Sequence, residues 1–236
     1  YKYIFYTPEK VEIKCYEEEF DCKVTFKSAR HELLLGFGKN QEELARLDDF
    51  VSKGLRIKGA RLREVHIIGY AEGEFGYNKH LAERRTHTLS YHVLSKYPQL
   101  KKASIYEIEG VGEDWKGLEN IINISSLAYK DEILSAIKRH NTDVAREAAI
   151  RSLDGGKVYA ELLSTVYPTL RRTVFRMRFD VRPYTDDELE EMFITVPGCL
   201  SQYEMCRLAQ QYAEQGKNPV NIYRKAYEQF ALDPLA

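Results

Sequence analysis

The sequence predicts an α+β fold: a two-layer α/β sandwich with a mixed sheet, a helical insertion and an all-α C-terminal tail. Three observations favour this fold class. Short β-rich segments alternate with amphipathic helical segments over the first half of the chain. The stretch at about 114–170 is helical throughout. A clean strand pattern then returns at Thr173–Val181, before a helical tail.

The composition limits the class of protein. With 44% hydrophobic residues among 236, the chain can bury a sizeable core, which excludes a wholly disordered protein. Lys and Arg number 35 against 36 Asp and Glu, a formal charge of -1. No overall field therefore attracts nucleic acid or an anionic membrane, although a local patch still can.

The chain shows neither a membrane-spanning segment nor a signal peptide. No apolar run approaches the roughly 20 residues that a membrane-spanning helix needs. Tyr1–Glu9 lacks a basic region followed by an apolar stretch. Because the chain begins with Tyr, we expect a mature or trimmed piece of a longer protein.

The N-terminal region is predicted to be extended. Residues 1–15 alternate and are rich in β-formers. The acidic run Glu17–Glu19 predicts a turn, and Lys23–Lys27 predicts a strand with Val24 and Phe26 on one side.

The next segments alternate between helix and strand. Gln41–Lys53 predicts a helix, because Leu44 and Leu47 share one face, with Asn40 as its cap and Gly54 as its stop. The pattern then predicts a buried strand at Glu64–Tyr70, a helix at Asn78–Tyr97 and a strand at Ala103–Glu109.

The second half holds an insertion, one strand and a tail. Apolar positions fit four helical segments within about 114–170, and Thr173–Val181 alternates as a half-buried strand. Amphipathic helices are predicted at Asp186–Phe193, Ser201–Gln215 and Pro219–Leu232. We therefore expect three regions: an N-terminal β segment of a preceding region (1–21), a domain with the helical insertion (22–183) and a helical tail (184–236).

The four cysteines form two pairs, Cys15/Cys22 and Cys199/Cys206, each seven positions apart. Neither pair has the spacing of a zinc or redox site. Two alternatives stay open for the first pair: a short disulfide across a turn, or two inert thiols.

One strand-to-helix junction carries the chemistry. A buried strand ends at Gly69, a Gly-rich acidic loop with Glu72 follows, and Tyr77 and Asn78 open a helix. Ligand sites in α/β proteins favour such loops, because helix N-terminal amides point at the bound group.

Arg85 is the second candidate at this junction. It lies four residues after Leu81 and four before Leu89, so it sits in the apolar stripe of its helix. Helical side chains lean towards the helix N-terminus, which aims Arg85 at the loop of Glu72. The interpretation leaves two partners open: Glu72, in a structural ion pair, or a ligand carboxylate.

Several short segments resemble the peptidoglycan-binding domain of the OmpA-like family, which also occurs in peptidoglycan-associated lipoproteins. They are Val24–Phe26, Gly69–Glu72, Tyr77–Asn78, Leu81–Thr86, Gly110–Glu113 and Arg171–Val174, in the order of the family's motifs. The resemblance covers about residues 22–183, apart from the helical insertion.

The resemblance implies a ligand and a set of residues. The family binds the peptide stem of peptidoglycan, chiefly its diaminopimelate. Glu72 takes the place of the family's loop Asp, which pairs with the ligand ammonium, and Arg85 that of the Arg that grips the carboxylate. Asn78 matches the family's loop-shaping Asn, and Tyr77 and Arg171 lie in matched motifs. Glu in place of Asp, and a loop two residues shorter than usual, are departures from the pattern.

A narrower resemblance extends beyond this domain. Leu153–Tyr159, Tyr167–Arg172 and Val181–Tyr184 look like a subgroup of envelope proteins of anaerobic gut-type Gram-negative bacteria. In that subgroup tetratricopeptide-like helices follow the OmpA-like domain, and the proteins are associated with the cell surface and adhesion structures.

Together these observations predict a non-catalytic cell-envelope protein without cofactor or metal. It would lie on the periplasmic side of the outer membrane, bind the peptidoglycan peptide stem and tether an outer-membrane protein to the wall. The alternative is a degenerate OmpA-like scaffold for protein–protein interaction in surface or adhesion assembly, with an envelope partner on its helical tail.

An enzyme is the third hypothesis, and the motifs speak against it. No nucleophile–base pair is apparent. His31 and Glu32 begin a zinc-protease motif that lacks its second His. His80 and His87 can share a helix face, but no further ligand stands at metal spacing.

Overall fold

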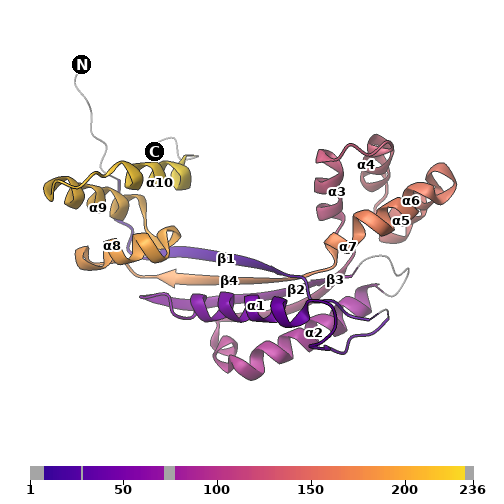
Figure 1. Cartoon of the computed structure of the whole chain (residues 1–236), viewed down its shortest axis with the longest axis horizontal. Coiled ribbons are helices and arrows are strands. Elements are labelled where there is room, and N and C mark those ends of the chain that lie inside the picture. The colour runs from indigo at the N-terminus through magenta and orange to yellow at the C-terminus, as the bar shows by residue number, and fades with distance from the viewer. Residues whose placement is uncertain (1–7, 28, 72–77, 232–236) are drawn as a thin grey trace, which may run out of the picture. The chain divides into compact units, whose positions relative to one another are not determined.

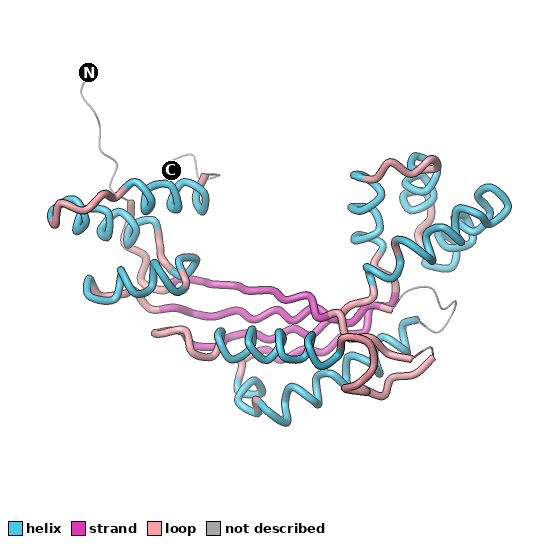
Figure 2. Tube along the Cα trace, viewed as in Figure 1, coloured by secondary structure: helices cyan, strands magenta, loops and turns pink. Residues whose placement is uncertain are grey.

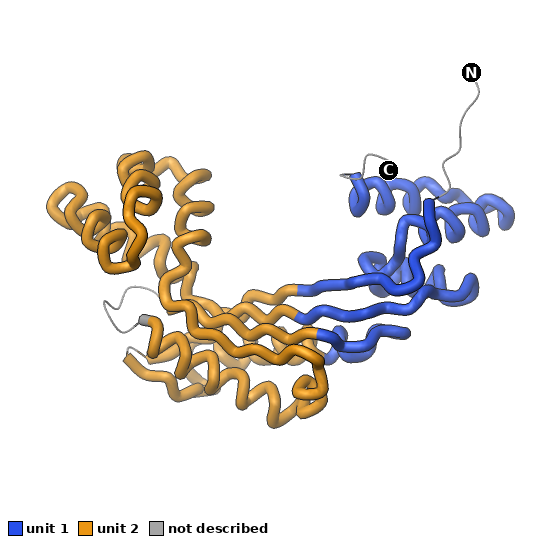
Figure 3. Tube along the Cα trace, turned by 180° about the vertical axis from the view of Figure 1, so that it is seen from behind, with its two compact units in different colours: residues 1–18, 52–63, 177–236 blue, residues 19–51, 64–176 orange. Residues whose placement is uncertain are grey.

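The computed structural model describes residues 8–27, 29–71 and 78–231, except the side chain of Asn78. The chain divides into two compact units, shown in Figure 3. Unit 1 contains residues 1–18, 52–63 and 177–236, and unit 2 contains residues 19–51 and 64–176. These units interleave along the chain, whereas the predicted regions follow one another, so the boundaries at 21/22 and 183/184 stay predictions.

Four strands form one mixed sheet: β1 (Lys14–Cys22), β2 (Ala60–Tyr70), β3 (Ile105–Gly112) and β4 (Thr173–Val181). Their order is β1-β4-β2-β3 (Figure 1). β2 and β3 are parallel, with Gly69 opposite Gly110. The Tyr70 amide donates to the Arg172 carbonyl at 2.9 Å, and the Arg182 amide donates to the Gly59 carbonyl at 3.1 Å. These two bonds mean that β4 runs antiparallel to β2.

The α-helices match the predicted positions closely. They are α1 (Asn40–Gly54), α2 (Asn78–Lys96), α3 (Trp115–Ile124), α4 (Lys130–Arg139), α5 (Asp143–Ser152), α6 (Lys157–Thr165), α7 (Tyr167–Leu170), α8 (Asp186–Thr195), α9 (Gln202–Glu214) and α10 (Val220–Phe230). The predicted fold class is confirmed. None of the described helices is long and apolar enough to cross a membrane.

The turn predicted at Glu17–Glu19 is wrong, because these residues lie inside β1. Alternate side chains of a strand point to opposite faces, so a run of three Glu does not need to break it. On the outer face Glu19 pairs with Arg176 of β4 at 2.7 Å. On the inner face Phe20 stacks on Phe50 of α1, with ring centroids 5.3 Å apart.

The strand predicted at Lys23–Lys27 is also wrong, because these residues form a loop. Asn40 explains the difference. Its Oδ1 accepts from the Thr25 amide at 2.7 Å, and its Nδ2 donates to the carbonyls of Thr25 and Leu34 at 2.9 and 2.8 Å. One buried amide side chain thus occupies backbone groups that a neighbouring strand would otherwise bind.

The disulfide alternative for Cys15 and Cys22 is excluded. Both residues are free thiols in β1, one exposed and one buried. Seven residues of extended strand span about 23 Å, far beyond disulfide reach. Burial raises the pKa of the Cys22 thiol to about 12, which makes it unreactive.

In unit 2 the sheet is covered on one side by α1 and α2 (Figure 2). The buried side chains of this layer are apolar: Leu44, Leu47, Val51, Val65, Ile67, Leu89 and Val93. The opposite side of the sheet carries several charged side chains. There His66 Nδ1 lies 3.1 Å from Glu107 Oε2 of the neighbouring strand.

The helical insertion of unit 2 has a core of its own. Its buried residues include Leu118, Ile122, Ile133, Ile150 and Leu162. Asp114 begins the insertion by capping α3: its side chain accepts from the Gly117 amide at 2.8 Å. A self-contained core supports the prediction of one helical excursion from a single sheet.

In unit 1 the helical tail begins with two capping boxes. Thr185 pairs with Glu188 at the start of α8, and Ser201 with Glu204 at the start of α9. Glu204 also binds the Lys14 ammonium at 2.7 Å, and both side chains are at least 93% buried. A buried ion pair therefore connects the helical tail to the start of β1.

Candidate functional site

A cavity of about 560 Å³ lies in unit 2, beside the N-terminal half of α2. Four segments line it: the loop after β1, the end of β2, one face of α2, and the junction between α7 and β4. The lining residues are Lys23–Phe26, Gly69, Tyr70, Ala82, Arg85, Thr86, Pro168 and Arg171–Thr173. The charged residues among them, Lys23, Arg85, Arg171 and Arg172, are all cations. We call this cavity the cationic pocket.

Two glycines allow α2 to lie close to the sheet at the pocket. A Cβ on Gly69 would stand 1.7 Å from Thr86 Oγ1, and a Cβ on Gly110 would stand 2.2 Å from the Glu83 amide nitrogen. At Gly110 the atom in the way belongs to the helix backbone, so only glycine fits there, whereas at Gly69 it is the hydroxyl of Thr86. The two glycines lie opposite each other in β2 and β3, so this one point of contact sets how α2 presents Arg85.

Arg85 is half-buried at the pocket wall, between the buried Leu81 and Leu89, as its helical spacing predicts. Its guanidinium turns to the loop after β1. Nε donates to the Arg30 carbonyl at 2.9 Å, and Nη2 donates to the Lys27 carbonyl at 3.3 Å. The guanidinium also lies 5.2 Å from the centre of the Phe26 ring.

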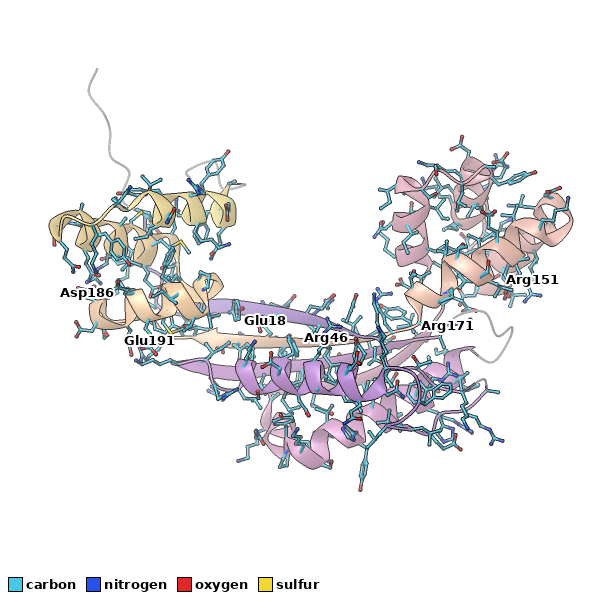
Figure 4. All side chains as sticks on the ribbon, in the orientation of Figure 1. Glu18, Arg46, Arg151, Arg171, Asp186 and Glu191 are labelled. Carbon is cyan, nitrogen blue, oxygen red and sulfur yellow. The ribbon has the colours of Figure 1, made fainter. Side chains whose placement is uncertain are left out.

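The opposite wall comes from the start of β4. Arg171 is exposed and stands at the junction between α7 and β4, where Figure 4 labels it. Arg172 is partly buried: its Nη1 binds Asp114 Oδ2 at 2.6 Å, and its Nε binds Asp21 Oδ1 at 3.1 Å. Its guanidinium lies 4.9 Å from the centre of the Tyr70 ring. Arg172 thus joins both ends of the helical insertion to the pocket wall.

The charges near Arg172 shift neighbouring pKa values. Burial of Arg172 opposes its positive charge, but the hydrogen bond and charge of Asp114, with those of Asp21, raise its pKa above the ordinary value. Burial, and then the negative charge of Asp114, raise the pKa of the Tyr70 hydroxyl. Both effects keep Arg172 charged and Tyr70 neutral over the physiological range.

The predicted site residues are only partly brought together. Arg85 and Arg171 line the same pocket. Asn78 is the first residue of α2, and its side chain lies outside the described residues, as do Glu72 and Tyr77. The predicted proximity of Glu72 and Arg85 therefore stays a prediction, and the described partners of Arg85 are carbonyl groups of the loop after β1.

Sequence reasoning missed Arg172, Asp114 and Lys23 as parts of this site. Arg172 and Asp114 are 58 positions apart, so no local spacing connects them. Lys23 stood in a predicted strand that is a loop. One signal existed for Asp114: it stands at the start of a helical pattern, and Asp is a favoured N-cap residue.

The other candidate residues from the sequence are not gathered into a site among the described residues. His80 Nδ1 lies 3.3 Å from Glu83 Oε2 on the surface of α2. Over residues 8–27, 29–71 and 78–231, no group of three or more His, Cys, Asp or Glu side chains is arranged to hold a metal ion. No family model matches the chain, and no curated protein shows significant sequence similarity to it. The resemblance to the OmpA-like family therefore stays a prediction.

Proposed function

We propose that this protein is a non-catalytic binding module of the OmpA-like kind, whose cationic pocket takes the peptide stem of peptidoglycan. In this proposal Arg85 and Arg171 bind carboxylates of the stem, including that of diaminopimelate, and Glu72, Tyr77 and Asn78 complete the site from the neighbouring loop. The module would lie on the periplasmic side of the outer membrane and tether an outer-membrane protein to the wall.

The observation that carries the proposal is the charge of the pocket. Four cations line about 560 Å³ of accessible space, and guanidinium groups form planar, paired hydrogen bonds with carboxylates. Arg85 comes from a rigid helix that two glycines hold against the sheet. A binding site gains affinity when its groups are held in place before the ligand arrives.

The chain order adds a second support. The described strands and helices follow the order β1-α1-β2-α2-β3 and, after the insertion, β4. The resemblance implies this same βαβαβ-β order. Ligand sites of α/β sheets lie beyond strand ends, where the cationic pocket lies with respect to β2.

Calorimetric titration with a diaminopimelate-containing stem peptide tests the proposal. We expect saturable binding that weakens as salt is raised, because the attraction is electrostatic. Arg85→Gln removes a charge-assisted hydrogen bond, for which we expect a loss of affinity of about 10- to 100-fold.

Arg84→Gln is the matched control. Arg84 is the exposed neighbour of Arg85 on the same helix, so its loss removes the same charge without changing the pocket. We expect less than about a twofold change in affinity for this variant. Absence of saturable binding at millimolar peptide would reject the proposal and favour the scaffold for protein–protein interaction.

A further inference from the structure

The loop between β1 and α1, described over residues 23–27 and 29–39, is long and irregular but firmly held. Asn40, fully buried, binds the backbone of Thr25 and Leu34. Arg85 binds the carbonyls of Lys27 and Arg30. Long irregular loops in compact proteins are usually either functional or disordered. Because two buried or half-buried side chains anchor this loop, it belongs with the functional loops.

The loop exposes two apolar side chains, and the Leu34 carbonyl is held by Asn40 at the start of α1. Leu34 is 41% exposed and the adjacent Leu35 is 55% exposed. The Phe37 amide donates to the Leu34 carbonyl at 3.1 Å, which closes a tight turn around them. Figure 2 shows this segment as the long loop beside the start of α2.

The same loop is strongly basic. Four exposed cations belong to it, Lys23, Lys27, Arg30 and Lys39, against the single carboxylate of Glu32. Four positive charges minus one negative give a formal charge of +3 for residues 23–39, whereas the whole chain carries -1. This loop is one local patch of the kind that the balanced composition still permits.

A loop that combines a net positive charge with two exposed leucines matches an anionic lipid surface better than a protein surface. Lys is depleted in protein–protein interfaces, and Leu is under-represented among their hot spots. Peripheral membrane segments combine Lys and Arg at the headgroups with Leu at the acyl boundary. The described part of the loop contains no Tyr or Trp, the residues that dominate protein hot spots.

We propose that residues 29–39, together with Lys27, form a membrane-docking loop, in which Leu34 and Leu35 enter the outer region of a bilayer rich in anionic phospholipid. Lys27, Arg30 and Lys39 bind the phosphate headgroups. This binding is peripheral and uses the part of the loop beyond Phe26, whereas Lys23–Phe26 line the cationic pocket. It depends on salt, because its electrostatic part is screened.

Co-sedimentation of the full chain with vesicles tests the proposal. The vesicles contain phosphatidylglycerol mixed with phosphatidylcholine, and vesicles of phosphatidylcholine alone serve for comparison. We expect partition onto the first kind and far less onto the second. Arg30→Gln with Lys39→Gln should lower the partition coefficient about 30-fold. Leu34→Ser with Leu35→Ser should lower it roughly tenfold.

Two control variants separate docking from a general surface effect. Tyr91→Ser removes a side chain of α2 that is 78% exposed. Lys101→Gln with Lys102→Gln removes two exposed cations elsewhere in unit 2. Both controls should bind vesicles like the wild type, and all variants should keep the wild-type far-ultraviolet spectrum.

The proposal is overturned if the wild type does not bind anionic vesicles, or if both loop variants bind them as well as the wild type. Loop-dependent binding to an acidic protein without vesicle binding would assign the loop to protein docking and overturn it as well. A Leu35→Trp variant adds a direct readout: its fluorescence should shift to shorter wavelength on vesicles and be quenched by brominated acyl chains.

Discussion

Two clusters of charge in this protein differ in their access to solvent. In unit 1, Lys14 and Glu204 are 7% and 4% exposed and bind each other at 2.7 Å. The carboxylate of Glu204 also accepts from the amides of Tyr184 and Ser201 at 2.7 and 2.8 Å. In unit 2, four cations line a cavity of about 560 Å³. A buried and fully bonded pair cannot exchange partners, whereas the exposed cations on the cavity wall, Lys23 and Arg171, can.

We therefore expect substitutions in the buried pair to change stability, and substitutions of exposed pocket cations to change ligand binding. Removing one member of a buried pair leaves the other charge without compensation, and the cost falls on stability. Removing an exposed charge from the cavity wall should mainly lower the affinity for the ligand. The variants below test this separation, from the largest expected effect to the smallest.

Lys14→Met should have the largest effect. It leaves Glu204 buried without its cation, for which we expect a loss of about 3–5 kcal/mol in the free energy of unfolding. Urea denaturation of the full chain measures this loss. The double variant Lys14→Met with Glu204→Gln should recover part of it. If Lys14→Met lowered the free energy of unfolding by less than the loss of an exposed ion pair does, the buried pair would not be what holds the tail to β1.

Gly110→Ala should come next. Its new Cβ would stand 2.2 Å from a backbone nitrogen of α2, which cannot move without shifting the helix. We expect a loss of about 2–3 kcal/mol in the free energy of unfolding, together with weaker ligand binding, because the same helix presents Arg85.

Gly36→Ala is the control for this substitution, since a Cβ on Gly36 would meet nothing within 4 Å. Equal stability of the two alanine variants in thermal unfolding would contradict the role of Gly110 in seating α2.

Asp114→Asn tests the link between the insertion and the pocket wall. It keeps a side-chain oxygen for the Gly117 amide but loses the charge that binds Arg172. We expect a loss of about 1–2 kcal/mol in the free energy of unfolding. Arg176→Gln removes an exposed ion pair from β4, the strand that follows Arg172, and should cost no more than about 0.5 kcal/mol. A larger loss of stability for Arg176→Gln than for Asp114→Asn would show that the Asp114–Arg172 pair does not hold the insertion in place.

The effect of pH on the stability of unit 1, through Glu188, should be smaller than the effects of the substitutions above. Two hydrogen bonds from Arg182, at 2.8 and 2.7 Å, and one from the Thr185 amide hold the pKa of Glu188 well below its ordinary value of 4.5. A carboxyl group with a lowered folded-state pKa stabilises the fold above 4.5, and this contribution is lost as the pH falls below it.

Glu188→Gln should therefore destabilise the protein near neutral pH, by no more than about 1 kcal/mol because Arg182 is largely exposed, and much less well below pH 4.5. Urea denaturation at the two pH values measures the difference. Glu191→Gln, whose side chain is 59% exposed, should show little change at either. A difference for Glu188→Gln that grew in acid would contradict the sign.

The sequence predicted the elements whose periodicity is local. β2, α2, β3 and β4 have apolar stripes within their own residues, and the structure has them within a few positions of the predicted bounds. β1 was misplaced because its acidic residues gain their partners from elsewhere. Glu19 binds Arg176 across 157 positions, a pairing that no local pattern reveals.

The site followed the same rule. The position of Arg85 in the pocket wall could be predicted, because residues four apart share a helix face. Its partners could not, since the carbonyls of Lys27 and Arg30 belong to a loop without periodic pattern. The bond between Arg172 and Asp114 closes the neck of an insertion, and only the folded chain brings these residues together.

The central claim is that the cationic pocket binds carboxylate groups through Arg85 and Arg171. Nuclear magnetic resonance of the arginine Nε–H groups tests it most directly, during titration with the diaminopimelate-containing stem peptide. We predict saturable shifts of the Arg85 and Arg171 resonances with one common affinity, while Arg178, outside the pocket lining, stays unchanged. Unchanged Arg85 and Arg171 resonances at saturating peptide, or shifts of Arg178 alone, would contradict the claim.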